Sequence, residues 1–189
     1  MKKTIVCALL GMILALGDSV FGAYDPKVPE ELRVRDGLPN LFAKLQAGRP
    51  VRIAYLGGSI TAANGWRPKT SAWLQSQYPD AEVVEINAAI SGTGSDYGAC
   101  RIVSDVLRHD PDLIFMEHRV NGGAGFEAKS VEGIVRQIWQ ANPHIDICLV
   151  YTISEGMLRG IQAGRQTGFG EVMETMANAY GIPSIDLGV

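Results

Sequence analysis

The chain has 189 residues, with 17 Lys and Arg against 20 Asp and Glu and a formal net charge of −3 at pH 7. The two signs of charge are interspersed, which argues against the basic field typical of a nucleic-acid-binding protein. Beyond residue 22 the length suits one domain with a sizeable core, and no apolar stretch there is long enough to span a membrane.

Residues 1–22 have the pattern of a secretory signal peptide. Two lysines are followed by the apolar run TIVCALLGMILALG and then by small residues. We expect cleavage near Gly22 or Ala23, and hence a secreted or periplasmic protein. An uncleaved N-terminal anchor is the alternative, which the shortness of the apolar run disfavours.

Residues 23–50 read as a Pro-rich lead-in with a short helix at 38–48. From residue 51 onward, apolar runs alternate with stretches of helical spacing. The predicted strands are 51–57, 81–87, 111–120, 144–152 and 182–188, and the predicted helices are 69–79, 95–110, 127–143 and 169–181. This alternation predicts an α/β fold with a central parallel sheet and helices on both of its faces.

Several positions within the predicted helices can be assigned from the pattern. Trp73 and Tyr78 are candidate core residues of the helix at 69–79, and Ser95 or Asp96 is the expected N-cap of the next helix. Gly181 is expected to terminate the last helix. The helix at 127–143 carries an apolar stripe, formed by Val131, Ile134, Val135, Ile138 and Trp139.

Two cysteines follow the expected signal peptide, Cys100 and Cys148. They could pair in an exported protein. Because Cys148 lies within an apolar strand, we favour two separate core thiols over a disulfide.

Three loops rich in glycine and small polar residues follow the first three predicted strands. Their sequences are GGSITAANGW, AAISGTGS and NGGAG. Because ligands of open parallel sheets bind beyond the carboxyl ends of the strands, these loops should form one site.

Ser59 is the candidate nucleophile in the first of these loops. It follows a strand in a tight Gly-Gly-Ser turn, where a hydroxyl is exposed and backbone donors are close. Gly92 can bring its N–H close to a reacting carbonyl, and Asn121 can add a side-chain amide. Taken singly, each has a plainer interpretation: a phosphate-binding or tight turn for Ser59, and turn residues for Gly92 and Asn121. Their joint occurrence favours a nucleophile with a three-donor oxyanion hole. Ser19, in Gly-Asp-Ser at 17–19, lies in the segment expected to be removed and is taken as a chance match.

With these residues in place, the chain resembles the SGNH hydrolases, also called the GDSL esterase/lipase family. The stretches YLGGSIT, NAAISGTGSDYGACR and PDLIFMEHRVN resemble its first three sequence blocks, and the resemblance runs from about residue 51 to 188. It implies a flavodoxin-like three-layer α/β/α sandwich, with residues 51–189 as the hydrolase domain, and ester hydrolysis without a metal or other cofactor. It also implies that Ser59 is the nucleophile and that the N–H groups of Ser59 and Gly92 and the Asn121 side chain are the oxyanion donors.

The third block departs from the family pattern. His118-Arg119 replaces an aromatic-Ala pair, and Gly122 replaces an Asp. Arg119 is therefore a candidate contact for an acidic substrate group, and Thr61 in the first block is a second candidate substrate contact. The alternative for Arg119, which we favour, is an ion pair with a nearby carboxylate such as Glu117.

The catalytic base is the larger departure. The family supplies it from an Asp-x-x-His block after the fifth strand, and no such block occurs up to Val189. We therefore expect the domain to be truncated, less stable than a complete one, and completed by an Asp and a His beyond Val189. Among the histidines present, His109 fits a helix end and His144 the opposite sheet edge. His118 is the only substitute base, and strand alternation turns it away from Asn121.

The sequence thus predicts an exported serine esterase acting on a small-molecule or carbohydrate ester, such as a carbohydrate deacetylase. No nucleic-acid partner and no stable membrane insertion after signal cleavage are expected. Acyl transfer by the same serine is an alternative. A non-catalytic carbohydrate-binding or interaction domain on the same fold is another.

Overall fold

The computed structural model describes residues 24–122 and 125–189, so the expected signal peptide lies outside the described residues. Its centre is a six-stranded sheet with the strand order β1-β6-β5-β4-β2-β3. All neighbouring strands are parallel except β1, which runs antiparallel to β6. The strands are β1 (Leu32–Arg33), β2 (Val51–Gly57), β3 (Val83–Asn87), β4 (Leu113–Glu117), β5 (Asp146–Tyr151) and β6 (Ser184–Asp186).

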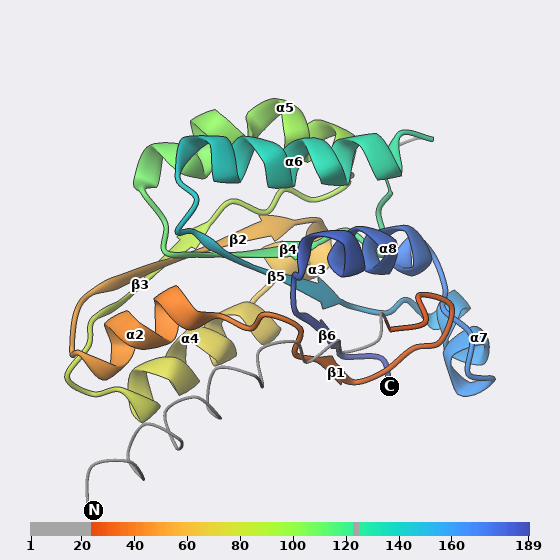
Figure 1. Ribbon diagram of the computed structural model, residues 1–189. Coiled ribbons are helices and arrows are strands. Elements are labelled where there is room, and N and C mark those ends of the chain that lie inside the picture. The colour runs from red at the N-terminus through yellow and green to blue at the C-terminus, as the bar shows by residue number, and fades with distance from the viewer. Residues whose placement is uncertain (1–23, 123–124) are drawn as a thin grey trace, which may run out of the picture.

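Helices cover both faces of the sheet, which confirms the expected three-layer α/β/α arrangement (Figure 1). One face carries α5 (Ser95–Asp105), α6 (Glu127–Ala141) and α8 (Gly170–Tyr180), and the other carries α2 (Pro39–Gln46) and α4 (Trp66–Gln77). The shorter helical segments are α3 (Ser59–Ala62), α7 (Leu158–Gln162) and two 3-10 turns, η1 (Leu107–His109) and η2 (Glu155–Met157).

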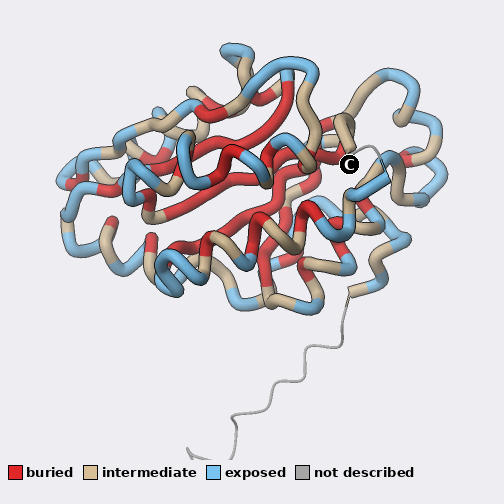
Figure 2. The backbone as a smooth tube through the Cα atoms, turned by 90° about the horizontal axis from the view of Figure 1, so that it is seen from above, coloured by how far each residue is buried: buried red, intermediate tan, exposed pale blue. Residues whose placement is uncertain are grey.

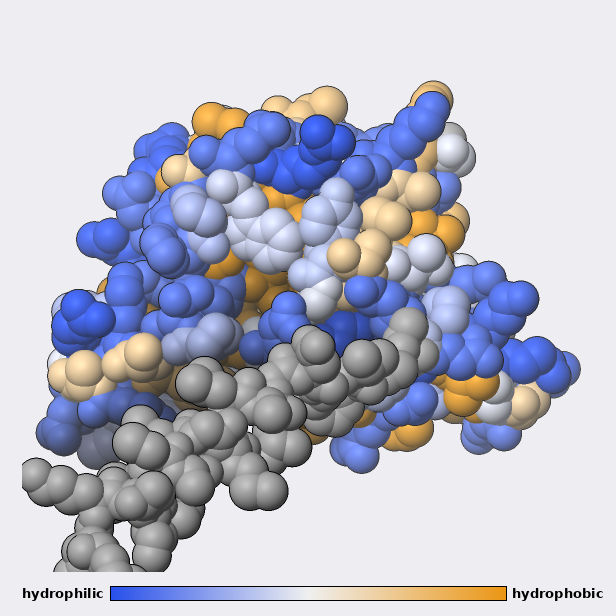
Figure 3. Space-filling model, in the orientation of Figure 1, coloured by the Kyte–Doolittle hydropathy of each residue, from blue (hydrophilic) through white to orange (hydrophobic). Residues whose placement is uncertain are grey.

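The core follows the central strands on both sides of the sheet. Strands β4 and β5 are buried over their whole length, and the buried residues form a continuous band in Figure 2. Ile102 and Ile134 fill one side of the sheet, and Leu41 and Leu74 fill the other. Strands covered on both faces have no solvent side, so their sequences are unbroken apolar runs. The surface seen in Figure 3 is mostly hydrophilic, with smaller apolar areas between.

The strand order decides where a site can form. Among the parallel strands, the first in the chain, β2, lies between β3 and β4, while β5 and β6 follow on the β4 side. The chain therefore reverses its direction of travel across the sheet between β2 and β4. In open α/β sheets this switch point, at the carboxyl ends of the strands, is where ligands bind.

Two assignments within the helices are corrected by the structure. Trp73 is 57% exposed rather than a core residue, because the buried stripe of α4 passes through Leu74, about 100° further round the helix. The N-cap of α5 is Gly94, not Ser95 or Asp96. Ser95 is instead the first helical residue, and its hydroxyl lies 2.7 Å from that of Ser130 on α6.

Other expectations agree with the structure or need partial revision. Gly181 ends α8 with φ +66°, as predicted. Cys148 is buried and free, whereas Cys100 is free but exposed, so only one of the two is a core thiol.

The lead-in is tied to the rest of the domain more closely than the sequence indicates. Its strand β1 pairs with β6, and Arg33 and Arg35 both form ion pairs with the buried Glu174 of α8. In the ranges that the structure describes, no helix has the length and apolarity needed to cross a membrane.

Candidate active site

Ser59 lies directly beyond the carboxyl end of β2, as the first residue of the short helix α3. Ser59 is exposed, while the two glycines before it are buried. A Cβ on Gly57 would lie 2.8 Å from the carbonyl oxygen of Glu117, and one on Gly58 would lie 2.8 Å from Nδ2 of Asn121. Backbone therefore excludes a side chain at residue 57, and a side chain at residue 58 would displace the Asn121 amide. The tight Gly-Gly-Ser turn presents the serine at the surface.

Asn121 brings its side-chain amide to this turn from the loop after β4. Because Ser59 is the first residue of a helix, its N–H has no acceptor within that helix. Two hydrogen-bond donors are therefore found at this turn: the N–H of Ser59 itself and the Asn121 amide, which lies against Gly58. Donors of these two kinds are what an oxyanion hole uses.

The loop after β3 reaches the same place. The carbonyl oxygen of Thr93 lies 3.6 Å from where a Cβ of Gly58 would be, and a Cβ on Gly94 would overlap the carbonyl oxygen of Gly122. Gly92 itself is exposed with φ +75°, a conformation that favours glycine, and has no heavy atom within 4 Å of its Cβ position. The three glycine-rich loops therefore converge on Gly58, while the role of Gly92 as an oxyanion donor stays a prediction.

Beneath the turn lies a buried carboxylate, that of Glu117 at the end of β4, with 2% of its surface exposed. It accepts hydrogen bonds from Oγ1 of Thr61 at 2.9 Å, from Oγ1 of Thr152 at 2.8 Å and from the N–H of Gly58. Burial raises the pKa of Glu117, and these hydrogen bonds offset part of the rise. Two of the three donors, Gly58 and Thr61, lie one residue before and two residues after Ser59.

Neither candidate substrate contact reaches the surface. Thr61 and Arg119 both have 0% of their surface exposed. Thr61 donates to Glu117, and Arg119 donates to Oδ2 of Asp186 at 2.5 Å and, through Nε, to the carbonyl oxygen of Thr152 at 2.8 Å. The favoured alternative for Arg119, an internal ion pair, matches the structure, but its partner is Asp186 and not Glu117.

None of the three histidines is placed to accept the proton of Ser59. His109 and His144 precede β4 and β5, at the opposite edge of the sheet from Ser59. His118 is 1% exposed and its ring packs against α5, where Nε2 would be 3.2 Å from a Cβ on Gly98. Burial, with the positive charge of Arg101, lowers the pKa of His118 to about 4.

The family follows from a comparison with known proteins. The model of the GDSL-like lipase/acylhydrolase family matches residues 55–188, which is more than half of the chain. The chain belongs to this family. A search of curated proteins gave no significant match.

Solved structures share the fold of this GDSL-like domain. A two-domain esterase (CEX) active on acetylated mannans, co-crystallised with mannopentaose, has a TM-score of 0.71 and 24% identity, covering 87% of this chain and 45% of its own. The acetyl xylan esterase AlAXEase has a TM-score of 0.59 and 19% identity over 73% of this chain and 78% of its own. A lipase/acylhydrolase from Enterococcus faecalis has a TM-score of 0.55 and 21% identity, covering 72% of this chain and 76% of its own. The chain thus spans less than half the length of the mannan esterase, and these likenesses show the fold.

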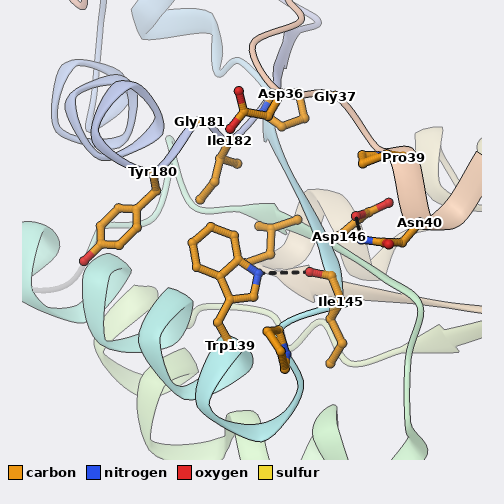
Figure 4. A pocket seen from close by; sticks show the side chains of 13 residues that line it. Asp36, Gly37, Pro39, Asn40, Trp139, Ile145, Asp146, Tyr180, Gly181 and Ile182 are labelled. Atoms are coloured by element: carbon orange, nitrogen blue, oxygen red, sulfur yellow. Dashed lines mark hydrogen bonds between the residues drawn. The ribbon is translucent and has the colours of Figure 1, made fainter. Parts of the chain in front are cut away.

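A cavity of about 250 Å³ in this GDSL-like domain lies away from Ser59 (Figure 4). It opens at the amino ends of β5 and β6, whereas Ser59 follows a carboxyl end. Two of its polar groups are already paired: the Trp139 indole donates to the carbonyl oxygen of Ile145 at 3.0 Å, and Asn40 donates to Asp146 at 2.9 Å. We therefore place the candidate active site at Ser59.

Sequence reasoning missed three residues around this site. Gly94 permits the contact between two loops, and Thr152 contacts both Glu117 and Arg119. Glu117 was considered only as a partner of Arg119. A signal was present for Glu117, because three polar residues, EHR, end an otherwise apolar strand; a lone threonine at the end of β5 carries no comparable signal.

Proposed function

We propose that the protein is a serine esterase that removes acyl groups from carbohydrate esters, with Ser59 as its nucleophile. The observation that supports it most strongly is the closeness of the Asn121 amide to Gly58, the residue before the exposed Ser59. Membership of an acylhydrolase family gives the reaction class. The acetylated mannans and xylans named for structurally similar esterases favour a small acyl group on a sugar.

In the proposed reaction, Ser59 Oγ attacks the acyl carbonyl carbon as a base accepts the hydroxyl proton. The negative charge on the carbonyl oxygen is stabilised by the N–H groups of Ser59 and Gly92 and by the Asn121 amide, each donor contributing about 3 kcal/mol. The sugar hydroxyl leaves with the proton, and water then hydrolyses the acyl-serine. The base is assigned to the family's Asp-x-x-His block, which residues 1–189 do not contain.

The domain limits and export remain part of the proposal. We assign residues 1–22 to a signal peptide, 23–50 to the lead-in and 51–189 to the hydrolase domain. Export agrees with a substrate such as a cell-wall or extracellular polysaccharide.

Ester hydrolysis by the full-length protein tests this proposal. With p-nitrophenyl acetate as substrate, Ser59→Ala should lower kcat/KM at least about 1,000-fold, because the nucleophile is lost. Ser76→Ala is the matched control, since Ser76 is an exposed serine on α4, and should keep wild-type activity. Equal rates for wild type and Ser59→Ala would contradict the proposal.

One observation favours a second candidate, a carbohydrate-binding domain without catalysis. None of the three histidines lies beside Ser59, and a serine hydroxyl without a base is a poor nucleophile. Binding of acetylated oligosaccharides by a full-length protein that hydrolyses no ester would support this candidate. Product formation that requires a second sugar hydroxyl in place of water would instead identify an acyltransferase.

A further inference from the structure

Two buried charged residues of β4 and its extension, Glu117 and Arg119, are joined through one threonine on the neighbouring strand. The hydroxyl of Thr152 donates to Oε1 of Glu117 at 2.8 Å, and its carbonyl oxygen accepts from Nε of Arg119 at 2.8 Å. Thr152 follows β5 and is 4% exposed, so this link is shielded from water. Its two ends lead to different parts of the domain.

One end of this link, the Glu117 carboxylate, holds the turn that contains Ser59. Oε2 of Glu117 accepts the hydroxyl of Thr61 at 2.9 Å, and the carboxylate also accepts the N–H of Gly58. Gly58 and Thr61 lie on either side of Ser59 in the chain. The carboxylate therefore restrains both ends of the turn that presents the Ser59 hydroxyl and N–H, although it does not face the substrate side itself.

The other end of this link holds the backbone where the chain leaves β6, at Asp186 and Gly188. Arg119 donates to Oδ2 of Asp186 at 2.5 Å, and Oδ1 of Asp186 accepts the N–H of Gly188 at 2.9 Å. A Cβ on Gly188 would lie 2.8 Å from Nη2 of Arg119, so the backbone leaving β6 passes close to the guanidinium. The polar chain thus runs Gly58/Thr61–Glu117–Thr152–Arg119–Asp186–Gly188, across the carboxyl ends of β2, β4, β5 and β6.

Stability alone does not account for such a chain. Buried ion pairs are often no more stabilising than apolar residues of the same volume, because each charge must be removed from water. A fully hydrogen-bonded buried network does favour one geometry, because any other arrangement leaves buried polar groups without partners. A polar chain that ends at Gly58 and Thr61, one residue before and two residues after Ser59, is therefore well suited to fixing the geometry of that turn.

We propose that Glu117, Thr152 and Arg119 are positioning residues. They hold the Ser59 turn at a fixed position relative to the backbone that follows β6. The inference rests on the proposed function of Ser59 and adds residues to it that do not touch the substrate. Thr152 is the central link, because its two hydrogen bonds join the carboxylate to the guanidinium. Loss of its hydroxyl frees one oxygen of Glu117 and loosens the turn at Gly58 and Thr61.

The test compares two substitutions at this link in the full-length protein. Thr152→Val keeps the side-chain shape but removes the hydroxyl, and should lower kcat for p-nitrophenyl acetate about 10- to 100-fold with KM unchanged. Thr152→Ser keeps the hydroxyl and should restore kcat to within about threefold of wild type. Ser184→Ala is the control for losing a buried hydroxyl elsewhere, because the Ser184 hydroxyl accepts a hydrogen bond from Arg35. This substitution should lower only the melting temperature.

A second readout does not depend on activity. Amide hydrogen exchange should quicken at Gly58 and in α3 in Thr152→Val, but not in Thr152→Ser or Ser184→Ala. Wild-type kcat and wild-type exchange at Gly58 in Thr152→Val would overturn the inference, as would equal losses in all three variants. If wild type and Ser59→Ala hydrolyse the ester equally, the proposed function fails, and the exchange at Gly58 still decides whether Thr152 positions the turn.

Discussion

His118 and Asn121 lie three residues apart after β4 and meet opposite environments. Asn121 is partly exposed and brings its amide to the Ser59 turn. His118 is buried against α5, and neither of its ring nitrogens has a hydrogen-bond partner in the described parts of the chain. His118 packs against α5 while Asn121 lies against Gly58, so closeness in sequence to Asn121 does not make His118 a base for Ser59.

The burial of His118 predicts a specific pH dependence of stability. The folded protein keeps this ring neutral, with a pKa of about 4 against an ordinary 6.5. As pH falls through 6.5 the unfolded chain binds a proton that the folded chain does not, so stability is lost on the acid side. Between pH 7 and pH 5 this loss amounts to about 2 kcal/mol.

Urea unfolding of wild type and His118→Leu at both pH values measures this contribution. The variant should lose about 2 kcal/mol less than wild type on going from pH 7 to pH 5. His109→Gln, which replaces an exposed histidine, should keep the wild-type pH dependence. An unchanged pH dependence in His118→Leu would show that the ring is protonated or released to solvent in the folded state.

At the scale of elements, the site depends on how closely three loops approach one another. Gly57 and Gly58 allow β4 and its following loop to lie against the Ser59 turn, and Gly94 allows the loop after β3 to contact Gly122. Each of these contacts is with backbone or with a short side chain, so there is little room to adjust. The loops form one edge because β2, β3 and β4 are parallel neighbours.

Gly94→Ala tests this close approach. Its Cβ would fall 1.5 Å from the carbonyl oxygen of Gly122, which forces the two loops apart and displaces Asn121. We expect a loss of about 1–3 kcal/mol in the free energy of unfolding, together with a lower kcat. Chemical denaturation and ester hydrolysis measure the two effects.

Gly133→Ala is the matched control on α6. A Cβ there meets nothing within 4 Å, so the substitution should raise the free energy of unfolding by about 0.4–1 kcal/mol and leave hydrolysis unchanged. Wild-type stability and activity in Gly94→Ala would mean that the loops are not held as closely as described.

Across the whole molecule, features that depend on local sequence patterns could be predicted, whereas those that depend on long-range contacts could not. The apolar runs at 51–57 and 144–152 identify β2 and β5, and the glycine-rich turn expected after the first run is present, with Ser59 exposed at the start of α3. Strand β1 could not be found this way, because its two residues form a strand only by pairing with β6. Trp73 was misassigned because helical spacing does not say which side of α4 faces the sheet.

The buried polar contacts near the site could not be predicted either, because they join residues far apart in the sequence. Arg119 pairs with Asp186, 67 residues further along the chain, and Thr152 donates to Glu117 from 35 residues away. Sequence shows a charge in a buried strand and predicts that it has a partner, but only the strand order brings a particular partner to it. The strand order itself follows from the β2–β4 switch, which no local pattern encodes.

Labelling of the full-length protein with a fluorophosphonate, followed by mass-spectrometric mapping of the modified peptide, tests most directly whether Ser59 is the nucleophile. An activated serine reacts with this probe, whereas an ordinary surface serine does not. We expect one adduct on Ser59, absent in Ser59→Ala and retained in Ser76→Ala. An unlabelled protein, or an adduct on another serine, would contradict the assignment of Ser59 as the nucleophile.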